Sequence, residues 1–379
     1  MIYLDNSATT RPYEDVLQVY TTIARNYFGN PSSLHTLGME SENVLVQAKK
    51  RLGAFLHCAT DQIVLTSGGT EANALAIHGS VKRKPGAHII TTTVEHASIY
   101  ENMQLLEQNG YDVTYLQADK YGFITVEQVK KAMQSNTALV SICHVQGELG
   151  TIQPIDEIGD FLQHYPQVKY HVDAVQSLLK VPFSINHAKV DLLSLSSHKI
   201  HGTKGTGMLY VRNAKSIDSL YRGGEQEQLI RPGTEHVAGA AGFAKALGIG
   251  AKKLETEPVR LGNLQKRLFL ELKDVDGIRI NSPLENVAPH IVNFSIAGLK
   301  AEVLVQSLAQ KNIYVSTQSA CSVKSGKPSR ILLGADLSKE IAESAIRISL
   351  SFETMEEEIE TCIQAIKSIV PKLQEVKSG

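Results

Sequence analysis

Between Gln62 and Val211, strand-like apolar runs alternate with helix-like runs, and this alternation constrains the fold more than any other feature of the chain. The strand-like segments are IVLT, HIITT, VTYLQ, ALVSIC, VKYHVD, DLLSLS and GMLYV. Runs such as EANALAIHGSV and ASIYENMQLLEQ lie between them. Helices between successive strands imply crossover connections, a mostly parallel sheet and helices on both of its faces. The sequence therefore predicts a large, doubly wound α/β domain with seven strands, which we place at residues 14–254.

A different pattern follows Arg260. A helical run at Leu261 to Leu272 is followed by strand-like IRI and HIVNFSI, a helix at Ala301 to Gln310, and strand-like YVST and AIRISLS. The closing segment from Met355 to Val376 is amphipathic and acidic at its start, as suits a helix N-terminus. This mixture predicts a smaller α+β domain formed by residues 255–379, with residues 1–13 folded onto it.

Charge and cysteine usage exclude several classes of function. The 379 residues carry a formal net charge of −1, so no global field favours nucleic acid or an anionic membrane. No apolar run is long enough to span a bilayer, and MIYLDNSATT lacks the features of a secretory signal. The four cysteines lie far apart and form no C-x-x-C pair, which argues against a disulfide scaffold and for a reducing cytoplasm.

Lys199 stands at an unusual place, directly after the apolar run DLLSLS and directly before a glycine-rich loop. A buried ammonium is costly unless it is paired or neutralised, so lysines in such places are often chemically active. A desolvated lysine amine can form a Schiff base with a carbonyl, including that of pyridoxal phosphate (PLP). Taken alone, the pattern also fits a surface lysine at a strand end.

Other strand ends carry candidate site residues. Gly69 and Thr70 lie between a strand and a helix, where free backbone N–H groups can cradle an anion. His96 could stack on a planar cofactor and transfer protons, and Asp173 could keep a pyridinium nitrogen protonated. Gln176 could donate to a phenolic oxygen of the same cofactor. Each position also fits an ordinary helix cap or turn, but open α/β sheets bind ligands at the carboxyl ends of their strands.

Two further candidates lie near the C-terminus. Cys321 stands in a polar segment with Lys324 and Lys327 nearby, which favours an exposed, reactive thiolate over a structural cysteine. Arg347 interrupts the apolar run SAIRISLS, so it needs an anionic partner, and its fork fits a carboxylate. That partner is either a bound ligand or a residue in a buried structural ion pair.

The order of the motifs adds specificity that no single motif has. N-P-S-S-x-H, S-G-G-T-E-x-N, E-H, H-V-D-A-x-Q, S-x-H-K, R-P-G-T-E, S-A-C-S and I-R-x-S-L follow one another along the chain. This series resembles the cysteine desulfurases, PLP enzymes of fold type I in the class V aminotransferase-like group. The short S-A-C-S form resembles the NifS/IscS-like branch.

The resemblance implies a complete cofactor site. Lys199 would be the Schiff-base lysine, Asp173 would pair with the pyridinium nitrogen, and Gln176 with the phenolic oxygen. His96 would stack on the ring and move protons. The phosphate would be held by Gly69, Thr70, Ser196 and His198, with Thr234 reaching across from the second subunit of a homodimer.

The same resemblance implies the reaction and its partners. Asn30 and Arg347 would bind the carboxylate of L-cysteine, and Cys321 would take its sulfur as a persulfide, leaving L-alanine. The sulfur would pass to acceptor proteins, such as an iron–sulfur scaffold or a tRNA-thiolating enzyme, in the cytoplasm. The alternatives are another PLP enzyme of this fold, such as an aminotransferase or a selenocysteine lyase, and a non-catalytic scaffold that binds a nucleotide or metal. The histidines lack metal-ligand spacing and no phosphate-binding P-loop is present, which disfavours the scaffold.

Three departures from the pattern of that family involve four positions. Gln146-Gly147 stands where two asparagines are usual, so Gln176 would contact the phenolic oxygen alone. Gln318 replaces a glycine ahead of S-A-C-S, and His236 stands where asparagine is frequent.

Overall fold

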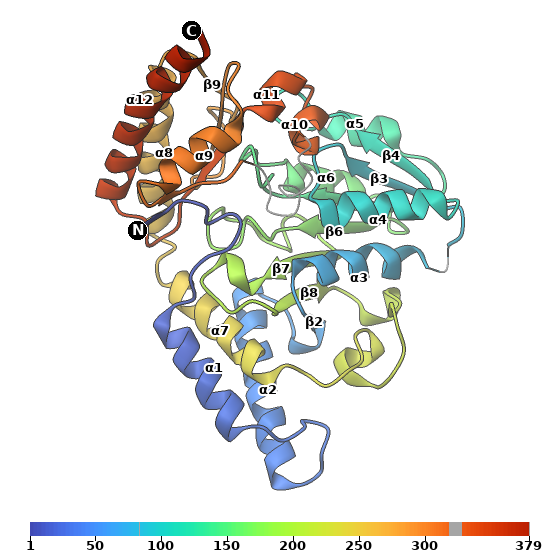
Figure 1. The fold of residues 1–379 in the computed structure, drawn as a ribbon. Helices are drawn as coiled ribbons and strands as arrows, with labels where there is room; N and C mark the ends of the chain where they lie inside the picture. Colours follow the sequence, from blue (N-terminus) through green and yellow to red (C-terminus); the bar gives the residue numbers. More distant parts are fainter. Residues whose placement is uncertain (83, 318–327, 379) are drawn as a thin grey trace.

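The computed structural model describes residues 1–82, 84–317 and 328–378, and a seven-stranded sheet forms its centre (Figure 1). The strands lie in the order β2 (Ile63–Thr66), β8 (Gly207–Val211), β7 (Leu192–Ser196), β6 (Lys169–Asp173), β5 (Thr137–Cys143), β3 (His88–Thr92) and β4 (Asp112–Leu116). Strand β8 is antiparallel to both of its neighbours, and the other neighbouring pairs are parallel. The predicted mostly parallel, seven-stranded α/β sheet is confirmed.

Both faces of the sheet are covered, because in most strands alternate residues enter different apolar clusters. In β2, Val64 packs on one face, whereas Ile63 and Leu65 join the large cluster on the other. The first face is covered by α3 (Gly69–Val81) and α4 (Ala97–Gln108). The large cluster on the other face, here called the first cluster, takes residues from α1 (Glu14–Asn26), α2 (Thr36–Leu56), α5 (Val126–Ala132), α6 (Ile155–Leu162) and α7 (Val237–Ala251).

Some boundaries differ from the expectation, and the first is a helix that the spacing of apolar residues predicts from Ser41 to Leu56. Helix α2 begins at Thr36 because the ring Nδ1 of His35 accepts a hydrogen bond from the Gly38 amide at 3.2 Å, which caps the first turn. Strand β11 (Ile313–Tyr314) overlaps the strand-like run YVST only at Tyr314. Helix α7 was not predicted, because its small apolar residues show no amphipathic pattern.

A second apolar cluster is built from the C-terminal part of the chain together with Leu4. It contains strands β9 (Ile278–Ile280), β10 (Ile291–Ile296) and β12 (Ala345–Ser349), and helices α8 (Glu257–Lys273), α9 (Ala301–Ala309) and α12 (Glu356–Ser378). Helices α10 (Arg330–Gly334) and α11 (Lys339–Glu343) instead contribute to the first cluster. The division into domains at residues 14–254, and 1–13 with 255–379, stays a prediction.

Residues 1–13, here called the N-terminal arm, connect the C-terminal apolar cluster with the central sheet. Strand β1 (Ile2–Tyr3) pairs with β11, and the following residues run along β12 toward the end of β7. There the Thr10 amide donates to the carbonyl of His198 at 2.9 Å. No helix within the described residues is long and apolar enough to cross a membrane.

Candidate active site

A cavity opens at the carboxyl edge of the sheet. Strands β2, β3, β5, β6 and β7 run in the same direction, so the residues that follow them meet at this edge. Nine of the predicted site residues line the cavity: Gly69, Thr70, His96, Asp173, Gln176, Ser196, His198, Lys199 and Arg347.

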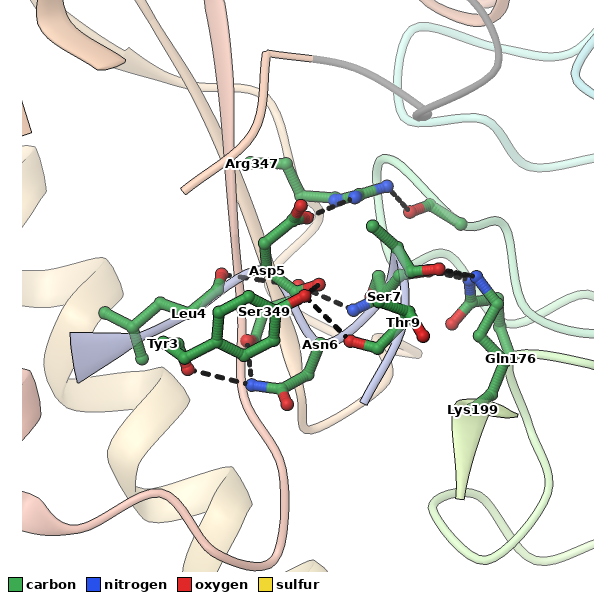
Figure 2. Close-up of polar contacts among 12 residues, drawn as sticks. Tyr3, Leu4, Asp5, Asn6, Ser7, Thr9, Gln176, Lys199, Arg347 and Ser349 are labelled. Atoms are coloured by element: carbon green, nitrogen blue, oxygen red, sulfur yellow. Dashed lines mark hydrogen bonds and ion pairs between the residues drawn. The ribbon is translucent and has the colours of Figure 1, made fainter. Parts of the chain in front are cut away.

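Lys199 ends a short 3₁₀ turn (Ser197–Lys199) directly after β7. Its amine donates to the carbonyls of Ser7 and Ala8, the latter at 2.8 Å, so the N-terminal arm forms part of the cavity wall (Figure 2). The buried Lys180 amine donates to the main-chain carbonyl of Lys199 at 2.8 Å. Burial, together with the positive charge of Lys199, lowers the pKa of Lys180 to about 7.

A chain of buried hydrogen bonds joins Asp173 to His96. The amide nitrogen of Asn73 donates to Asp173 Oδ2 at 2.8 Å and to Ser98 Oγ at 2.9 Å. Ser98 Oγ in turn lies 2.8 Å from His96 Nδ1. The other carboxylate oxygen of Asp173 accepts from the Val175 amide at 2.9 Å. Hydrogen bonds to both carboxylate oxygens therefore fix the orientation of the Asp173 side chain.

The same contacts fix the tautomer of His96. Its Nδ1 accepts a hydrogen bond from the Ser98 amide at 3.1 Å as the cap of α4, so the proton of the neutral ring is on Nε2. Burial lowers the pKa of His96, which favours this neutral form. A neutral imidazole beside a carboxylate and an amine suits proton transfer near neutral pH.

An anion cradle lies on another wall. Helix α3 begins at Gly69, so the unpaired N–H groups of its first turn face the cavity together with Thr70. The buried hydroxyl of Ser196 has no hydrogen-bond partner among the described residues. Burial lowers the pKa of His198 to about 3, so this ring is a neutral donor or acceptor. The cradle can thus hold a phosphate-sized anion.

Arg347 lies almost fully buried in β12 and faces the cavity. One of its terminal nitrogens donates to the Gly147 carbonyl at 3.0 Å and the other to Asp5 Oδ1 at 2.8 Å (Figure 2). Arg347 therefore has the structural ion-pair partner of one interpretation, and it also lines the cavity, so ligand binding at Arg347 stays a prediction.

The departure at Gln146-Gly147 lies in the same wall. The side-chain oxygen of Gln146 accepts from the amides of Glu148 and Leu149 at 2.7 and 2.6 Å, which holds the turn that carries Gly147. A Cβ atom at Gly147 would lie 3.4 Å from the amide nitrogen of Gln176. That nitrogen donates to the Ser7 carbonyl at 2.9 Å.

Some predicted residues are not brought to the cavity. Asn30 and Thr234 are exposed and do not line it. His236 packs edge-on against Tyr20. Cys321 and Gln318 lie outside the described residues.

Sequence reasoning also missed site residues. Asn73 and Ser98 connect Asp173 with His96, and Asp5 pairs with Arg347. The available signal for Asn73 was a polar residue inside the apolar helical run EANALAI.

Comparisons with known proteins agree with this geometry. The family model described as aminotransferase class-V matches residues 2–362. A cysteine desulfurase IscS from Dictyoglomus turgidum is 36% identical over 379 residues, which is 99% of this chain and 96% of the relative. A solved NifS-like protein superposes with a TM-score of 0.91 at 32% identity, covering 98% of this chain and 99% of that one. SspA in complex with cysteine has a TM-score of 0.80 at 32% identity, covering 92% and 99%. The chain therefore belongs to the class-V aminotransferase family, among its cysteine desulfurases of the NifS/IscS type.

Proposed function

We propose that this enzyme uses PLP to remove sulfur from L-cysteine, giving L-alanine and a persulfide on Cys321 that is passed to acceptor proteins. One observation carries the proposal: an amine, a carboxylate, an imidazole and an anion cradle line a single cavity through Lys199, Asp173, His96 and Thr70. A non-catalytic scaffold has no need of these groups together.

The cavity fits PLP at each of its polar positions. The unpartnered hydroxyl of Ser196 and the start of α3 suit the phosphate, and Asp173 suits the pyridinium nitrogen. Lys199 would supply the amine for the aldehyde, and Gln176, which also lines the cavity, would donate to the phenolic oxygen. When bound, PLP withdraws electrons from the amino acid, which weakens the bonds at its α- and β-carbons.

The protein's own groups would then position the substrate and move protons. Arg347 offers a buried guanidinium for the substrate carboxylate. The Lys199 amine has a resting place on the carbonyls of Ser7 and Ala8 whenever it is released from the cofactor. From there it can take or return a proton, as can His96 on the other side of the network.

Cysteine as the substrate is supported by SspA, which was solved in complex with cysteine. Cys321 is assigned the transfer of sulfur because it stands in a polar segment of the sequence with Lys324 and Lys327 nearby. Its thiolate would attack the substrate sulfur, so that the C–S bond breaks and alanine leaves. The acceptor would be an iron–sulfur scaffold or a tRNA-thiolating enzyme.

A homodimer forms part of the proposal. Thr234 is exposed and does not line this cavity, as expected for a residue that would reach the phosphate of a second subunit, and the exposed Asn30 would likewise need a second subunit to reach a cavity. The segment between α1 and α2 and the first turn of α2 also expose large apolar side chains: Phe28 at 71%, Leu34 at 96%, Leu37 at 43% and Met39 at 60%. Such a group suits burial against another copy.

Turnover of L-cysteine by the PLP-loaded enzyme tests the proposal. We expect equal amounts of alanine and sulfide in the presence of a reductant, and borohydride should fix the cofactor on the peptide that contains Lys199. Cys321→Ser should keep the cofactor absorbance and lose sulfide production. Full sulfide production by this variant would reject the proposal and favour another PLP enzyme of this fold.

The dimer is tested by sedimentation of the same preparation. Thr234→Ala should weaken PLP binding without changing the spectrum of the enzyme that retains cofactor. A fully active, PLP-loaded monomer would contradict the proposed interface.

A further inference from the structure

Arg347 has a counter-ion from the N-terminal arm. The distance between one of its terminal nitrogens and Asp5 Oδ1 is 2.8 Å, and the two side chains point toward each other (Figure 2). The Arg347 side chain is 2% exposed and that of Asp5 is 21% exposed. The pair is thus largely shielded from water, and each charge acts strongly on the other.

The position of Asp5 is fixed by the strand that carries Arg347. Asp5 forms an isolated bridge with Ser349 of β12. On one side of Asp5, the Ser349 amide donates to the Leu4 carbonyl at 2.7 Å. On the other side, the Ser7 amide donates to Ser349 Oγ at 2.8 Å. The carboxylate of Asp5 is therefore a built-in neighbour of the guanidinium.

Arg347 keeps donors for a second anion. One terminal nitrogen contacts the Gly147 carbonyl and the other contacts Asp5, but a guanidinium has further N–H groups. Its Nε is buried and has no partner among the described residues. Since Arg347 lines the cavity, a ligand carboxylate that binds there would be the second carboxylate on the same guanidinium.

We propose that Asp5 competes with ligand carboxylates for Arg347 and thereby sets how tightly the enzyme binds them. This inference rests on the proposed function, which places the carboxylate of an amino acid at Arg347. Two carboxylates beside one guanidinium repel each other, so binding requires that Asp5 shift or accept a proton. Burial raises the pKa of Asp5, although the positive charges of Arg347 and Lys199 lower it in part. The ionised form of Asp5 is therefore already destabilised before a ligand binds.

Asp5→Asn removes the charge and keeps an oxygen that can accept from Arg347. The ligand carboxylate would no longer be repelled by Asp5, and Arg347 would lack a counter-ion until the ligand supplies one. Both changes favour ligand binding. We expect the variant to bind carboxylate ligands roughly tenfold more tightly than the wild type, a change of about 1.4 kcal/mol. It should also lower KM for L-cysteine more than it changes kcat.

Calorimetric titration of the PLP-loaded enzyme with 3-mercaptopropionate measures this effect, because that probe has no amine to react with the cofactor. The neutral 3-mercaptopropionamide should bind equally well to both proteins. Asp15→Asn is the matched control, because Asp15 pairs with Lys245 at 2.9 Å, is 61% exposed, and does not line the cavity. It should leave the affinity for 3-mercaptopropionate unchanged.

Equal or weaker binding of 3-mercaptopropionate by Asp5→Asn would overturn the inference and leave Asp5 a structural residue. Asp5→Ser, which also removes the charge, provides a second test if the first variant does not fold. The two proposals can fail separately. A wild type that does not turn over L-cysteine would reject the proposed function, whereas tighter probe binding by Asp5→Asn would still support competition at Arg347.

Discussion

Asn73 determines how two functional groups are oriented at once, because a single amide nitrogen donates to both Asp173 and Ser98. Ser98 passes this constraint to His96 through its hydroxyl and its amide. All of these contacts are buried or nearly so, and a buried polar group that loses its partner is costly. The chain Asp173–Asn73–Ser98–His96 should therefore behave as one energetic unit.

A double-mutant cycle on Asn73→Ala and Ser98→Ala tests this coupling. Each single change should lower the free energy of unfolding by about 1–3 kcal/mol, since each leaves a buried partner without its hydrogen bond. The double variant should lose less than the sum, by about 0.5–3 kcal/mol, because the contact between the two is lost only once. Urea unfolding followed by circular dichroism gives all four values, and strict additivity would show that the two residues act independently.

The same residues show what sequence reasoning can find. Lys199, Asp173 and His96 were predicted because each lies at or just after the end of an apolar strand. Burying an ionisable group there costs free energy, which suggests that the group has a function. Asn73 and Asp5 were missed because their roles depend on partners 100 and 342 residues away in the chain. A hydrogen bond across such a separation leaves no local pattern.

Helix α7 packs closely against Leu179, which lies in a turn after β6, at the position of Gly250. Leu179 has a left-handed backbone with φ at 64°, an unfavourable conformation for a leucine. Its Cδ1 lies only 2.2 Å from where a Cβ atom of Gly250 would be. The close packing of Leu179 against α7 thus requires a glycine at position 250. Gly248, in the same helix, has nothing within 4 Å of its Cβ position and is exposed.

Two alanine substitutions in α7 should therefore have opposite effects. Gly248→Ala should raise the free energy of unfolding by about 0.5–1 kcal/mol, because alanine loses less backbone entropy in a helix. Gly250→Ala should lower it by about 1–3 kcal/mol through overpacking against Leu179. Thermal or urea unfolding of the two variants side by side provides the comparison, and a stabilised Gly250→Ala would show that Leu179 can move at little cost.

At the scale of the molecule, the sheet was predictable and the connection between its parts was not. The central strands are largely buried on both faces, so they appear in the sequence as short runs rich in apolar residues. Helices α10 and α11 pack on the first cluster although their neighbours in sequence belong to the second. The arm that brings Asp5, Ser7 and Ala8 to the cavity is short and polar, and its position depends on β11 and β12 near the other end of the chain.

Several buried histidines make the whole fold sensitive to acid. His171 in β6 is fully buried, with its ring nitrogens 2.8 Å from Ser141 Oγ and 2.9 Å from Ser194 Oγ. Burial lowers the pKa of His171 to about 3, and it lowers the pKa of His144 and His201 to about 4. Below the ordinary histidine pKa of about 6.5, these histidines are protonated in the unfolded chain but stay neutral in the folded chain. The contribution of these histidines to the free energy of unfolding is therefore fully present above about pH 6.5 and is lost progressively as the pH falls toward about 4.

Replacing one of these histidines should remove its share of the pH dependence. Each contributes a slope of about 1.4 kcal/mol per pH unit between pH 6.5 and its own lowered pKa. His171→Gln should lower stability at pH 7.5, because glutamine cannot reach both serines, and it should flatten the slope between pH 4.5 and 6.5 by about that amount. His164→Gln, at an exposed position, is the control and should leave the slope unchanged. Urea unfolding across this pH range separates the two effects, and the same slope in wild type and His171→Gln would mean that His171 takes up its proton in the folded protein.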